Sequence, residues 1–486
     1  MSLDPVVDLI HTPLSDSWKP SNERALEALF GTRYAKRAEK LVTLRAPWSQ
    51  VPFAAYIHPA STDSGAYGGM SFVMFPGEEK MPCLIGMVIG IAGLEPDHAI
   101  LGRPGHGRRM QAICDWLNKE FGKGDLVAWA KHDPTRTDLS VPDSIQRRWG
   151  SYQAAFQKYG HVMYAMFRPT ENREATLAAV KAMLDVMFEE RGCETLTAHR
   201  SDSEAIRSKW FSCLMPQTSA DQVVRVLGDR RYVILQGPPG TGKTEMARGI
   251  LLENYQGRGR SIQFHPTTSY ENFIGGLAPV QGNGSDALGF RFAPQRGFLM
   301  EAAAEAVADS QARPYLLHVD EINRADLGKV LGEAIYLLEP RAIKQREIRL
   351  PYDFGDPYVQ RFHLPNNLHI LGTMNSSDRS IAIVDVAVRR RFAFLSLWPS
   401  LDVVKDKGCD LGIKAFEELM SIFVEHAPEE SLALAPGHSY FLGNESEVRT
   451  SFKTAVEPLL QEYLEQGYVT GFAESIRGYL QWLRGQ

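Results

Sequence analysis

The sequence predicts an α/β domain with a parallel sheet in the C-terminal half of the chain. In three stretches an apolar run is followed by a polar turn and then by a helical pattern: "YVILQGPPGTGKTEMARGILLE", "YLLHVDEINRADLGKVLGEAIYLLE" and "LHILGTMNSSDRSIAIVDVAVRRRF". Strands that alternate with helices form parallel sheets covered by those helices. Helical patterns dominate after residue 400, so we also predict a helical lid at the C-terminus.

The first 190 or so residues have a different pattern. Short apolar runs broken by turn residues, such as "GGMSFVMFP" and "CLIGMVIGIAGL", predict a mostly antiparallel sheet. Helical patterns cover 20–45, 108–121 and 173–191, which makes this part an α+β domain. We therefore predict four segments: an α+β domain over 1–192, a linker or lead-in helix over 193–218, an α/β domain over 219–398 and a helical lid over 399–486.

Composition narrows the class of protein. The chain has 486 residues, 44% hydrophobic and 23% charged, as expected for a folded globular protein. Its net charge of −5 gives no overall basic character, although a local patch could still bind nucleic acid. Five scattered cysteines without a C-x-x-C pair indicate neither a disulfide framework nor a zinc site. Without a basic leader or an apolar run of about 18 residues, we expect a cytoplasmic protein that does not cross a membrane.

The segment "GPPGTGKT" matches the phosphate-binding pattern G-x-x-x-x-G-K-[ST] and lies between a predicted strand and a predicted helix. Its glycines let backbone N–H groups curl around phosphate oxygens, and the positive end of the helix dipole favours the same anion. Lys243 adds a charge near the β and γ phosphates, and the Thr244 hydroxyl is suited to Mg²⁺. We predict eight nucleotide-binding residues: Gly237, Pro238, Pro239, Gly240, Thr241, Gly242, Lys243 and Thr244.

An acidic pair ends the second predicted strand, "YLLHVDE". Mg²⁺ prefers carboxylate and water oxygens, so Asp320 is expected to hold the ion together with Thr244. Glu321 is expected to polarise the water that attacks the nucleotide. An acid that caps the following helix is the alternative, but the phosphate-binding loop upstream favours the catalytic interpretation.

The third predicted strand ends at Asn375, in "LGTMNSSDRS". Ligands of parallel sheets gather at the carboxyl ends of the strands, where a neutral amide can contact the γ-phosphate without competing for Mg²⁺. Asp378 follows after one short turn. Both residues are predicted to be catalytic, and both are also suited to capping the next helix.

Three consecutive arginines, Arg389, Arg390 and Arg391, end that helix. Arginines in a last turn interact favourably with the negative end of the helix dipole. A second interpretation makes Arg390 and Arg391 arginine fingers that reach the active site of a neighbouring subunit. The second interpretation requires a ring of subunits.

Together these motifs resemble the AAA+ superfamily, and most closely its McrB family. "VDEINRADLGKVLGEAIYLLE", "MNSSDRSIAIVDVAVRRRF", "QFHPTTSYENFIGGLAP" and "GHSYF" are similar to ordered elements of that family, over roughly residues 220–445. The resemblance implies a hexameric ring, hydrolysis at subunit interfaces, a preference for GTP over ATP, and an McrC-like endonuclease partner. It makes Asn375 the sensor residue and assigns Arg390 and Arg391 to the interface. Ser376 and Ser377 replace the family's Thr–Ala pair.

The N-terminal domain resembles the McrB-type DNA-recognition domain more weakly, through "VPFAAY" and "KYGHVMYAMF". That resemblance implies binding of double-stranded, modified DNA with a base taken into an aromatic slot. The candidate residues for base and phosphate contacts are Phe53, Tyr56, Tyr67, Arg103, Arg108 and Arg109. Aromatic residues in alternating strands more often form core, and the arginines fit a solvated surface as well.

Three functions remain open from the sequence. The first is a GTP- or ATP-hydrolysing, Mg²⁺-dependent motor of a modification-dependent restriction system, in which the partner nuclease cuts the DNA. The second is a MoxR- or dynein-like AAA+ ATPase that remodels a protein. The third is a binding module whose nucleotide site only controls assembly. Neither the modified base nor the oligomeric state without nucleotide follows from the sequence.

Overall fold

The computed structural model describes residues 5–12, 40–44, 51–61, 66–77, 81–281, 290–339, 346–377 and 386–486. The chain divides into two compact units. Unit 1 comprises residues 1–215 with 421–429, and unit 2 comprises residues 216–420 with 430–486. Within the described ranges, no helix has both the length and the apolar character that crossing a membrane requires.

Unit 1 contains a six-stranded antiparallel sheet with the strand order β1-β2-β3-β4-β6-β5. The residues of β2, β3, β4 and β6 are buried along the whole length of each strand, so both faces of the sheet are covered. The strands are β1 (Lys40–Leu44), β2 (Phe53–Ile57), β3 (Met70–Phe75), β4 (Leu84–Ile89), β5 (Ala128–Ala130) and β6 (Met163–Phe167).

The helix predicted over 20–45 is wrong at its C-terminal end, because Lys40–Leu44 pairs with β2 as a strand. Two of its five residues, Val42 and Thr43, are β-branched, and tertiary pairing overrides the weak helical preference of the flanking sequence. Residues 20–39 lie outside the described ranges.

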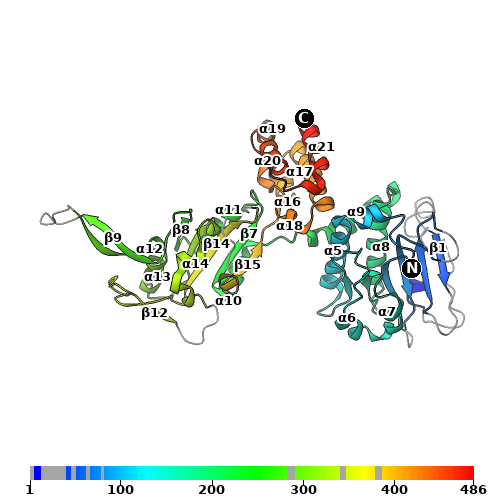
Figure 1. Cartoon of the computed structure of the whole chain (residues 1–486), viewed down its shortest axis with the longest axis horizontal. Coiled ribbons are helices and arrows are strands. Elements are labelled where there is room, and N and C mark those ends of the chain that lie inside the picture. The colour runs from blue at the N-terminus through cyan, green and yellow to red at the C-terminus, as the bar shows by residue number, and fades with distance from the viewer. Residues whose placement is uncertain are drawn as a thin grey trace. The chain divides into compact units, whose positions relative to one another are not determined.

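Helices α5 and α8 pack against the sheet of unit 1, and α9 packs on both of them (Figure 1). Trp210 and Leu214 of α9 are buried, and Arg207 forms a bidentate ion pair with Asp185 of α8. Much of the segment predicted as a linker or lead-in helix is therefore a helix, and it belongs to unit 1. The helices are α1 (Pro5–Ile10), α4 (His98–Leu101), α5 (Pro104–Phe121), α6 (Asp143–Arg148), α7 (Gln153–Tyr159), α8 (Arg173–Glu190) and α9 (Arg200–Leu214), with 3-10 turns η1 (Gly150–Tyr152) and η2 (Thr197–His199).

Unit 2 is built on a five-stranded parallel sheet with the order β15-β7-β14-β11-β8 (Figure 1). The three strands predicted from the sequence, β7, β11 and β14, are neighbours in its centre. Their carboxyl ends therefore meet at one edge of the sheet. The strands are β7 (Tyr232–Gly237), β8 (Gly259–Gln263), β11 (Tyr315–Asp320), β14 (Leu368–Asn375) and β15 (Ala393–Ser396).

Helices cover both faces of this sheet. Val233 and Leu235 of β7 pack with α10 and α11, whereas Tyr232 and Ile234 pack in a second core with α13 and α14. Successive side chains of a strand point to opposite faces, which explains why the strands read as continuous apolar runs. The helices are α10 (Ala220–Arg230), α11 (Lys243–Glu253), α12 (Tyr270–Phe273), α13 (Phe298–Ala308), α14 (Leu327–Leu331) and α15 (Val386–Arg389), with 3-10 turns η3 (Ile322–Arg324) and η4 (Gly332–Leu337).

Two antiparallel hairpins belong to unit 2 in addition to the main sheet. One joins β9 (Gly275–Gln281) to β10 (Phe290–Arg296) and extends away from the five-stranded sheet (Figure 1). Phe290 and Phe292 on this hairpin are exposed, with ring centroids 5.9 Å apart. The other pairs β12 (Glu347–Arg349) with β13 (Arg361–His363).

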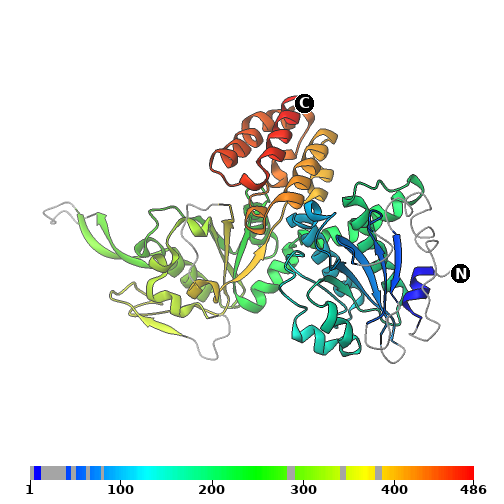
Figure 2. The same cartoon turned by 45° about the vertical axis from the view of Figure 1, so that its right-hand side comes forward.

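The C-terminal part of the chain is helical, as the sequence predicts (Figure 2). Phe416, Phe441 and Phe452 stack edge to face in its core. Its helices are α16 (Leu401–Lys407), α17 (Asp410–His426), α18 (Glu429–Leu432), α19 (Glu445–Ser451), α20 (Glu457–Glu465) and α21 (Ala473–Arg484), with 3-10 turns η5 (His438–Phe441) and η7 (Thr470–Phe472) and the π turn η6 (Phe452–Val456). The α/β fold class with a helical lid is thus confirmed.

Candidate active site

The loop between β7 and α11 has the shape of a phosphate-binding loop. β7 ends at Gly237 and α11 begins at Lys243, so the predicted strand–loop–helix order is present. Gly240 and Gly242 have φ angles of 78° and 77°, in the left-handed region that glycine adopts without steric cost. The loop therefore places backbone groups and the N-terminus of an 11-residue helix at one point, as anion binding requires.

Lys243 lies inside this loop and is only 7% exposed. Its ammonium group donates hydrogen bonds to the carbonyl oxygens of Gly237 at 3.0 Å and Pro238 at 2.6 Å. The Thr241 hydroxyl donates to the Pro238 carbonyl at 3.0 Å. A positive charge is thus held within the curve of the loop, where it favours a bound anion.

Asp320, the last residue of β11, faces the start of α11. The Thr244 hydroxyl donates a hydrogen bond to Asp320 Oδ1 at 2.9 Å, and the Thr373 hydroxyl of β14 donates to the same oxygen. A carboxylate and a hydroxyl at hydrogen-bond distance are oxygen donors of the kind that Mg²⁺ binds. These residues fit the metal site that the sequence predicts.

Glu321 has a left-handed backbone, with φ 51° and ψ 46°. Such a conformation is uncommon for a residue other than glycine and is concentrated at functional sites. Its N–H donates to the Thr373 hydroxyl at 3.2 Å, and its carboxylate accepts from Gln263 Nε2 at 3.3 Å. The same carboxylate forms an ion pair with Arg324. The predicted general base is therefore held by two partner side chains.

Asn375, the last residue of β14, lies opposite Gly237 in the parallel register. The following residue, Ser376, donates from its N–H to the Gly237 carbonyl at 3.0 Å. Asn323 donates from Nδ2 to the Asn375 carbonyl at 3.4 Å, which ties this residue to the turn after β11. Asn375 thus lies beside the first glycine of the loop. Asp378 lies outside the described residues.

Three residues of this edge were not identified from the sequence: Thr373, Gln263 and Arg324. Thr373 lies two residues before Asn375, and strand periodicity places both on the same face. Gln263 ends β8, which is the neighbour of β11, so its position follows once the strand order is known. Arg324 lies three residues after Glu321, within one turn of the chain.

The two arginines predicted to act as arginine fingers, Arg390 and Arg391, differ in their exposure. Arg390 is exposed in the turn after α15. Arg391 is only 7% exposed, and its Nη1 donates to the Ala387 carbonyl at 2.6 Å. Arg391 is thus engaged by a backbone carbonyl of its own chain, and its contact with a neighbouring subunit stays a prediction. Arg390 stays a candidate.

The lid contacts the phosphate-binding loop through the segment "GHSYF". The N–H of Gly437 donates to the Pro239 carbonyl at 2.9 Å, and the N–H of Ser439 donates to the Gly240 carbonyl at 3.0 Å. The conformation of the loop and the position of this lid segment are therefore linked by backbone hydrogen bonds.

Comparison with known proteins agrees with this geometry. The family model of the AAA domain (dynein-related subfamily) matches residues 232–392. The type IV methyl-directed restriction enzyme EcoKMcrB subunit of Escherichia coli (strain K12) is 32% identical over 287 residues, which are 54% of this chain and 60% of that protein. Over these residues the chain is a homologue of an McrB subunit.

A second relative of the chain is the type II restriction enzyme BsuMI component YdiS of Bacillus subtilis (strain 168). It is 27% identical over 197 residues, covering 34% of this chain and 56% of the relative. The chain thus spans less than two thirds of either protein. A solved RuvB P216G mutant of Thermotoga maritima has 15% identity and a TM-score of 0.24, covering 55% of this chain and 73% of that structure. That score adds nothing to the assignment.

The aromatic residues predicted to bind a base are mostly core residues. Phe53 is 8% exposed and packs against Phe75 and Tyr159, with ring centroids 6.3 and 5.9 Å away, and Tyr56 is 1% exposed. This burial contradicts a role of Phe53 and Tyr56 as walls of an open slot. Tyr67 is half-buried, and burial raises its pKa to about 12.

The arginines predicted to contact phosphates are occupied within unit 1. Arg108 is 9% exposed and donates to the carbonyls of Val424 at 2.5 Å and Ala427 at 2.6 Å. Arg109 forms ion pairs with Glu190 and Glu425 at 2.8 and 2.9 Å. The Nη groups of Arg108 and Arg109 thus already have acceptors within unit 1, and the predicted phosphate contacts would have to replace these bonds.

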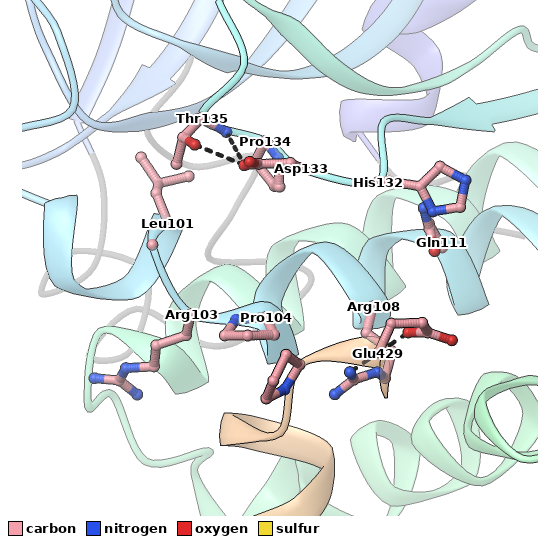
Figure 3. Close-up of a pocket in the computed structure, with 12 residues that line it drawn as sticks. Leu101, Arg103, Pro104, Arg108, Gln111, His132, Asp133, Pro134, Thr135 and Glu429 are labelled. Carbon is pink, nitrogen blue, oxygen red and sulfur yellow. Dashed lines mark hydrogen bonds and ion pairs between the residues drawn. The ribbon is translucent and has the colours of Figure 1, made fainter. Parts of the chain in front are cut away.

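Arg103 is partly exposed and pairs with Glu425 at 2.8 Å. Figure 3 shows it with Arg108 beside a pocket of about 420 Å³. Glu429 lies next to Arg108 in that pocket, and Asp133 lies on the opposite side. Acidic groups in the lining make the pocket a poor binding site for a phosphodiester backbone. Of the three predicted arginines, Arg103 has the most exposed side chain, at 39% against 9% for Arg108 and 17% for Arg109.

Proposed function

We propose that the chain is an NTP-hydrolysing subunit, with GTP favoured over ATP, of a modification-dependent DNA restriction system. One observation carries the proposal: the phosphate-binding loop, the Thr244–Asp320 pair, Glu321 and Asn375 lie along one edge of a parallel sheet. The similarity to two restriction-enzyme components supports the restriction part. The preference for GTP follows from the resemblance to McrB.

The loop would bind the phosphate chain through its backbone and the N-terminus of α11. In this account, Lys243 exchanges its contacts with the Gly237 and Pro238 carbonyls for phosphate oxygens. Thr244 and Asp320 would hold Mg²⁺, which supplies charge neutralisation at the phosphates when bound. All three side chains lie within or next to the loop, so binding requires no large rearrangement of the sheet.

Glu321 would orient and deprotonate the attacking water, and for this its carboxylate leaves Arg324. The amide of Asn375 would contact the γ-phosphate from the next strand, and Asp378 would support that turn. Arg390 from a neighbouring copy in a hexameric ring would stabilise charge on the transferred phosphoryl group. Glu321 and Asn375 lie at the same sheet edge, whereas Arg390 precedes β15 and would act on the site of the neighbouring copy. Asp378 lies outside the described residues.

Unit 1 would recognise modified double-stranded DNA, and an McrC-like endonuclease would cut it. The chain by itself is not expected to cleave DNA. We propose a base-binding surface outside Phe53, Tyr56, Arg108 and Arg109, and the burial or pairing of these side chains within unit 1 supports this.

The test is hydrolysis of GTP and of ATP by the purified full chain with Mg²⁺, with and without an McrC-like subunit and methylated duplex DNA. We expect faster turnover of GTP and stimulation by the nuclease subunit. ATP-selective turnover that ignores both DNA and partner would reject the restriction function while leaving the nucleotide site intact. A Lys243→Ala chain is the control for contaminating hydrolases.

A protein-remodelling ATPase is the second candidate. The matched family model is described as dynein-related, and the β9–β10 hairpin exposes Phe290 and Phe292. Exposed aromatic residues of this kind are typical of protein contacts. In the same hydrolysis assay this candidate predicts ATP selectivity, together with a protein substrate as the stimulating component.

A further inference from the structure

The lid segment "GHSYF" comes unusually close to the phosphate-binding loop. A Cβ built on Gly437 would lie 2.0 Å from the carbonyl carbon of Gly240, so any side chain at this position would collide with the loop backbone. Together with the hydrogen bonds of Gly437 and Ser439 described above, this contact fixes the position of the residue between them, His438.

The hydrogen bonding of His438 defines which ring nitrogen carries the proton. The backbone N–H of Ser400 donates to His438 Nδ1 at 3.2 Å. A backbone N–H can only donate, so Nδ1 is the acceptor and the neutral ring carries its proton on Nε2. Burial of the ring, with a contribution from the charge of Lys407, lowers the pKa of His438 to about 4. The ring is therefore neutral near pH 7, with Nε2–H as its donor.

The donor nitrogen faces the loop. Nε2 of His438 lies 3.7 Å from the Cβ position of Gly242, the residue directly before Lys243 and α11. Within the described part of the chain, no hydrogen-bond acceptor is found for Nε2. The side chain is only partly buried.

We propose that His438 donates a hydrogen bond from Nε2 to the phosphate chain of the bound nucleoside triphosphate. The lid thereby contributes a nucleotide-binding residue to the site. This inference rests on the proposed function, because it requires that the loop binds phosphate. A purely structural role for His438, in which the ring only accepts from Ser400, is the competing explanation.

Two substitutions separate these explanations. In His438→Asn the side-chain oxygen replaces Nδ1 and keeps the hydrogen bond from Ser400, but no donor reaches the position of Nε2. In His438→Gln the amide nitrogen reaches the position of Nε2, whereas the acceptor for Ser400 is displaced. His438→Asn thus removes the Nε2 donor, and His438→Gln removes the Nδ1 acceptor.

The measurement is the affinity of each full-length variant for fluorescent GTP and GDP with Mg²⁺, with pyrophosphate as the competitor. A hydrogen bond to a charged phosphate predicts about tenfold weaker binding for His438→Asn. His438→Gln should stay within about threefold of the wild type, since it keeps a donor. Near-normal binding by His438→Asn with a large loss in His438→Gln would overturn the proposal. So would equal losses in both variants.

The wild-type chain distinguishes this inference from the proposed function. If it binds neither GTP, ATP nor GDP, the nucleotide site itself is refuted. If it binds them and His438→Asn binds as tightly, only the role of His438 is refuted. Thermal unfolding of both variants checks that the lid remains folded, and a loss of affinity is counted only for a variant whose melting temperature is unchanged.

Discussion

The two sheets of this chain differ in where they leave polar side chains. In the parallel sheet of unit 2, β7, β11 and β14 end side by side, and each delivers a polar or loop residue to the same edge. In the antiparallel sheet of unit 1, β2, β3, β4 and β6 are buried from end to end. Parallel topology concentrates strand ends at one edge, which is where ligands bind in such folds.

Charged groups also have different surroundings in the two units. Glu190 of unit 1 is buried between His106 and Arg109, at 2.5 and 2.8 Å. Although burial opposes its ionisation, these two neighbours hold the pKa of Glu190 below its usual value. In unit 2 the acidic pair Asp320–Glu321 is partly accessible beside the loop. In unit 1 the Glu190 carboxylate is thus paired with side chains of the same unit. In unit 2 the carboxylates of Asp320 and Glu321 remain accessible to a ligand.

The largest expected effect tests the core assignment of Phe53. Phe53→Ala should lower the free energy of unfolding of unit 1 by about 3–5 kcal/mol, since it removes a buried ring that packs on Phe75 and Tyr159. Urea titration followed by tryptophan fluorescence measures the change. Phe211→Ala is the matched control, because Phe211 is exposed in the same unit and should cost about 0.5 kcal/mol or less.

A loss of DNA binding without a loss of stability would contradict the placement of Phe53 in the core of unit 1. If Phe53 lined a base-binding slot, Phe53→Ala would weaken binding to modified DNA and leave the free energy of unfolding unchanged. That outcome would support the role in base binding that the sequence predicts for Phe53.

An intermediate effect concerns the acid stability of unit 2. Burial, with a contribution from Arg231, lowers the pKa of His369 to about 4, and Nδ1 of the ring pairs with the Tyr255 hydroxyl at 2.5 Å. Between about pH 6.5 and 4 the unfolded chain binds a proton that the folded chain refuses, so stability falls as the pH falls. From pH 7 to 5 this amounts to about 2 kcal/mol.

Urea titrations of wild-type and His369→Gln chains at pH 7 and pH 5 measure this effect. The variant lacks the titrating ring, so its stability should depend less on pH by about the same 2 kcal/mol. Equal pH dependence in both chains would show that His369 titrates normally in the folded state.

The smallest effect concerns the ion pair between Arg324 and Glu321. The pair is partly exposed, with Arg324 44% and Glu321 21% accessible, so it is worth about 1 kcal/mol or less. Arg324→Ala should free the carboxylate and raise basal turnover by up to about fivefold. Steady-state phosphate release at saturating nucleotide measures it, with Lys329→Ala as an exposed control. Reduced turnover would instead assign Arg324 a positive role in catalysis.

Residues fixed by backbone geometry were predictable from the sequence. The loop from Gly237 to Thr244 and the strand ends at Asp320 and Asn375 follow from local patterns, because glycine conformations and strand–turn–helix order are encoded in neighbouring residues. Gln263 and His438 were not assigned a role, because their positions depend on strand order and on a lid contact far along the chain.

Unit 1 shows the limit of such prediction. Whether an arginine in "GRPGHGRRM" meets solvent or a buried carbonyl depends on what packs against α5, and the acceptors for Arg108 lie more than 300 residues away in sequence. Aromatic residues in strands give the same signal in a core and in a binding slot. Only the observation that both sheet faces are covered decides between these alternatives for Phe53 and Tyr56.

We propose that the sheet edge of unit 2 hydrolyses a nucleoside triphosphate with Glu321 as the base. The most direct measurement is turnover and nucleotide affinity of Glu321→Gln in parallel, in the full chain with Mg²⁺. We expect turnover to fall by about 100-fold or more while the affinity for the triphosphate stays within a few fold of the wild type. Undiminished turnover in Glu321→Gln would contradict the account.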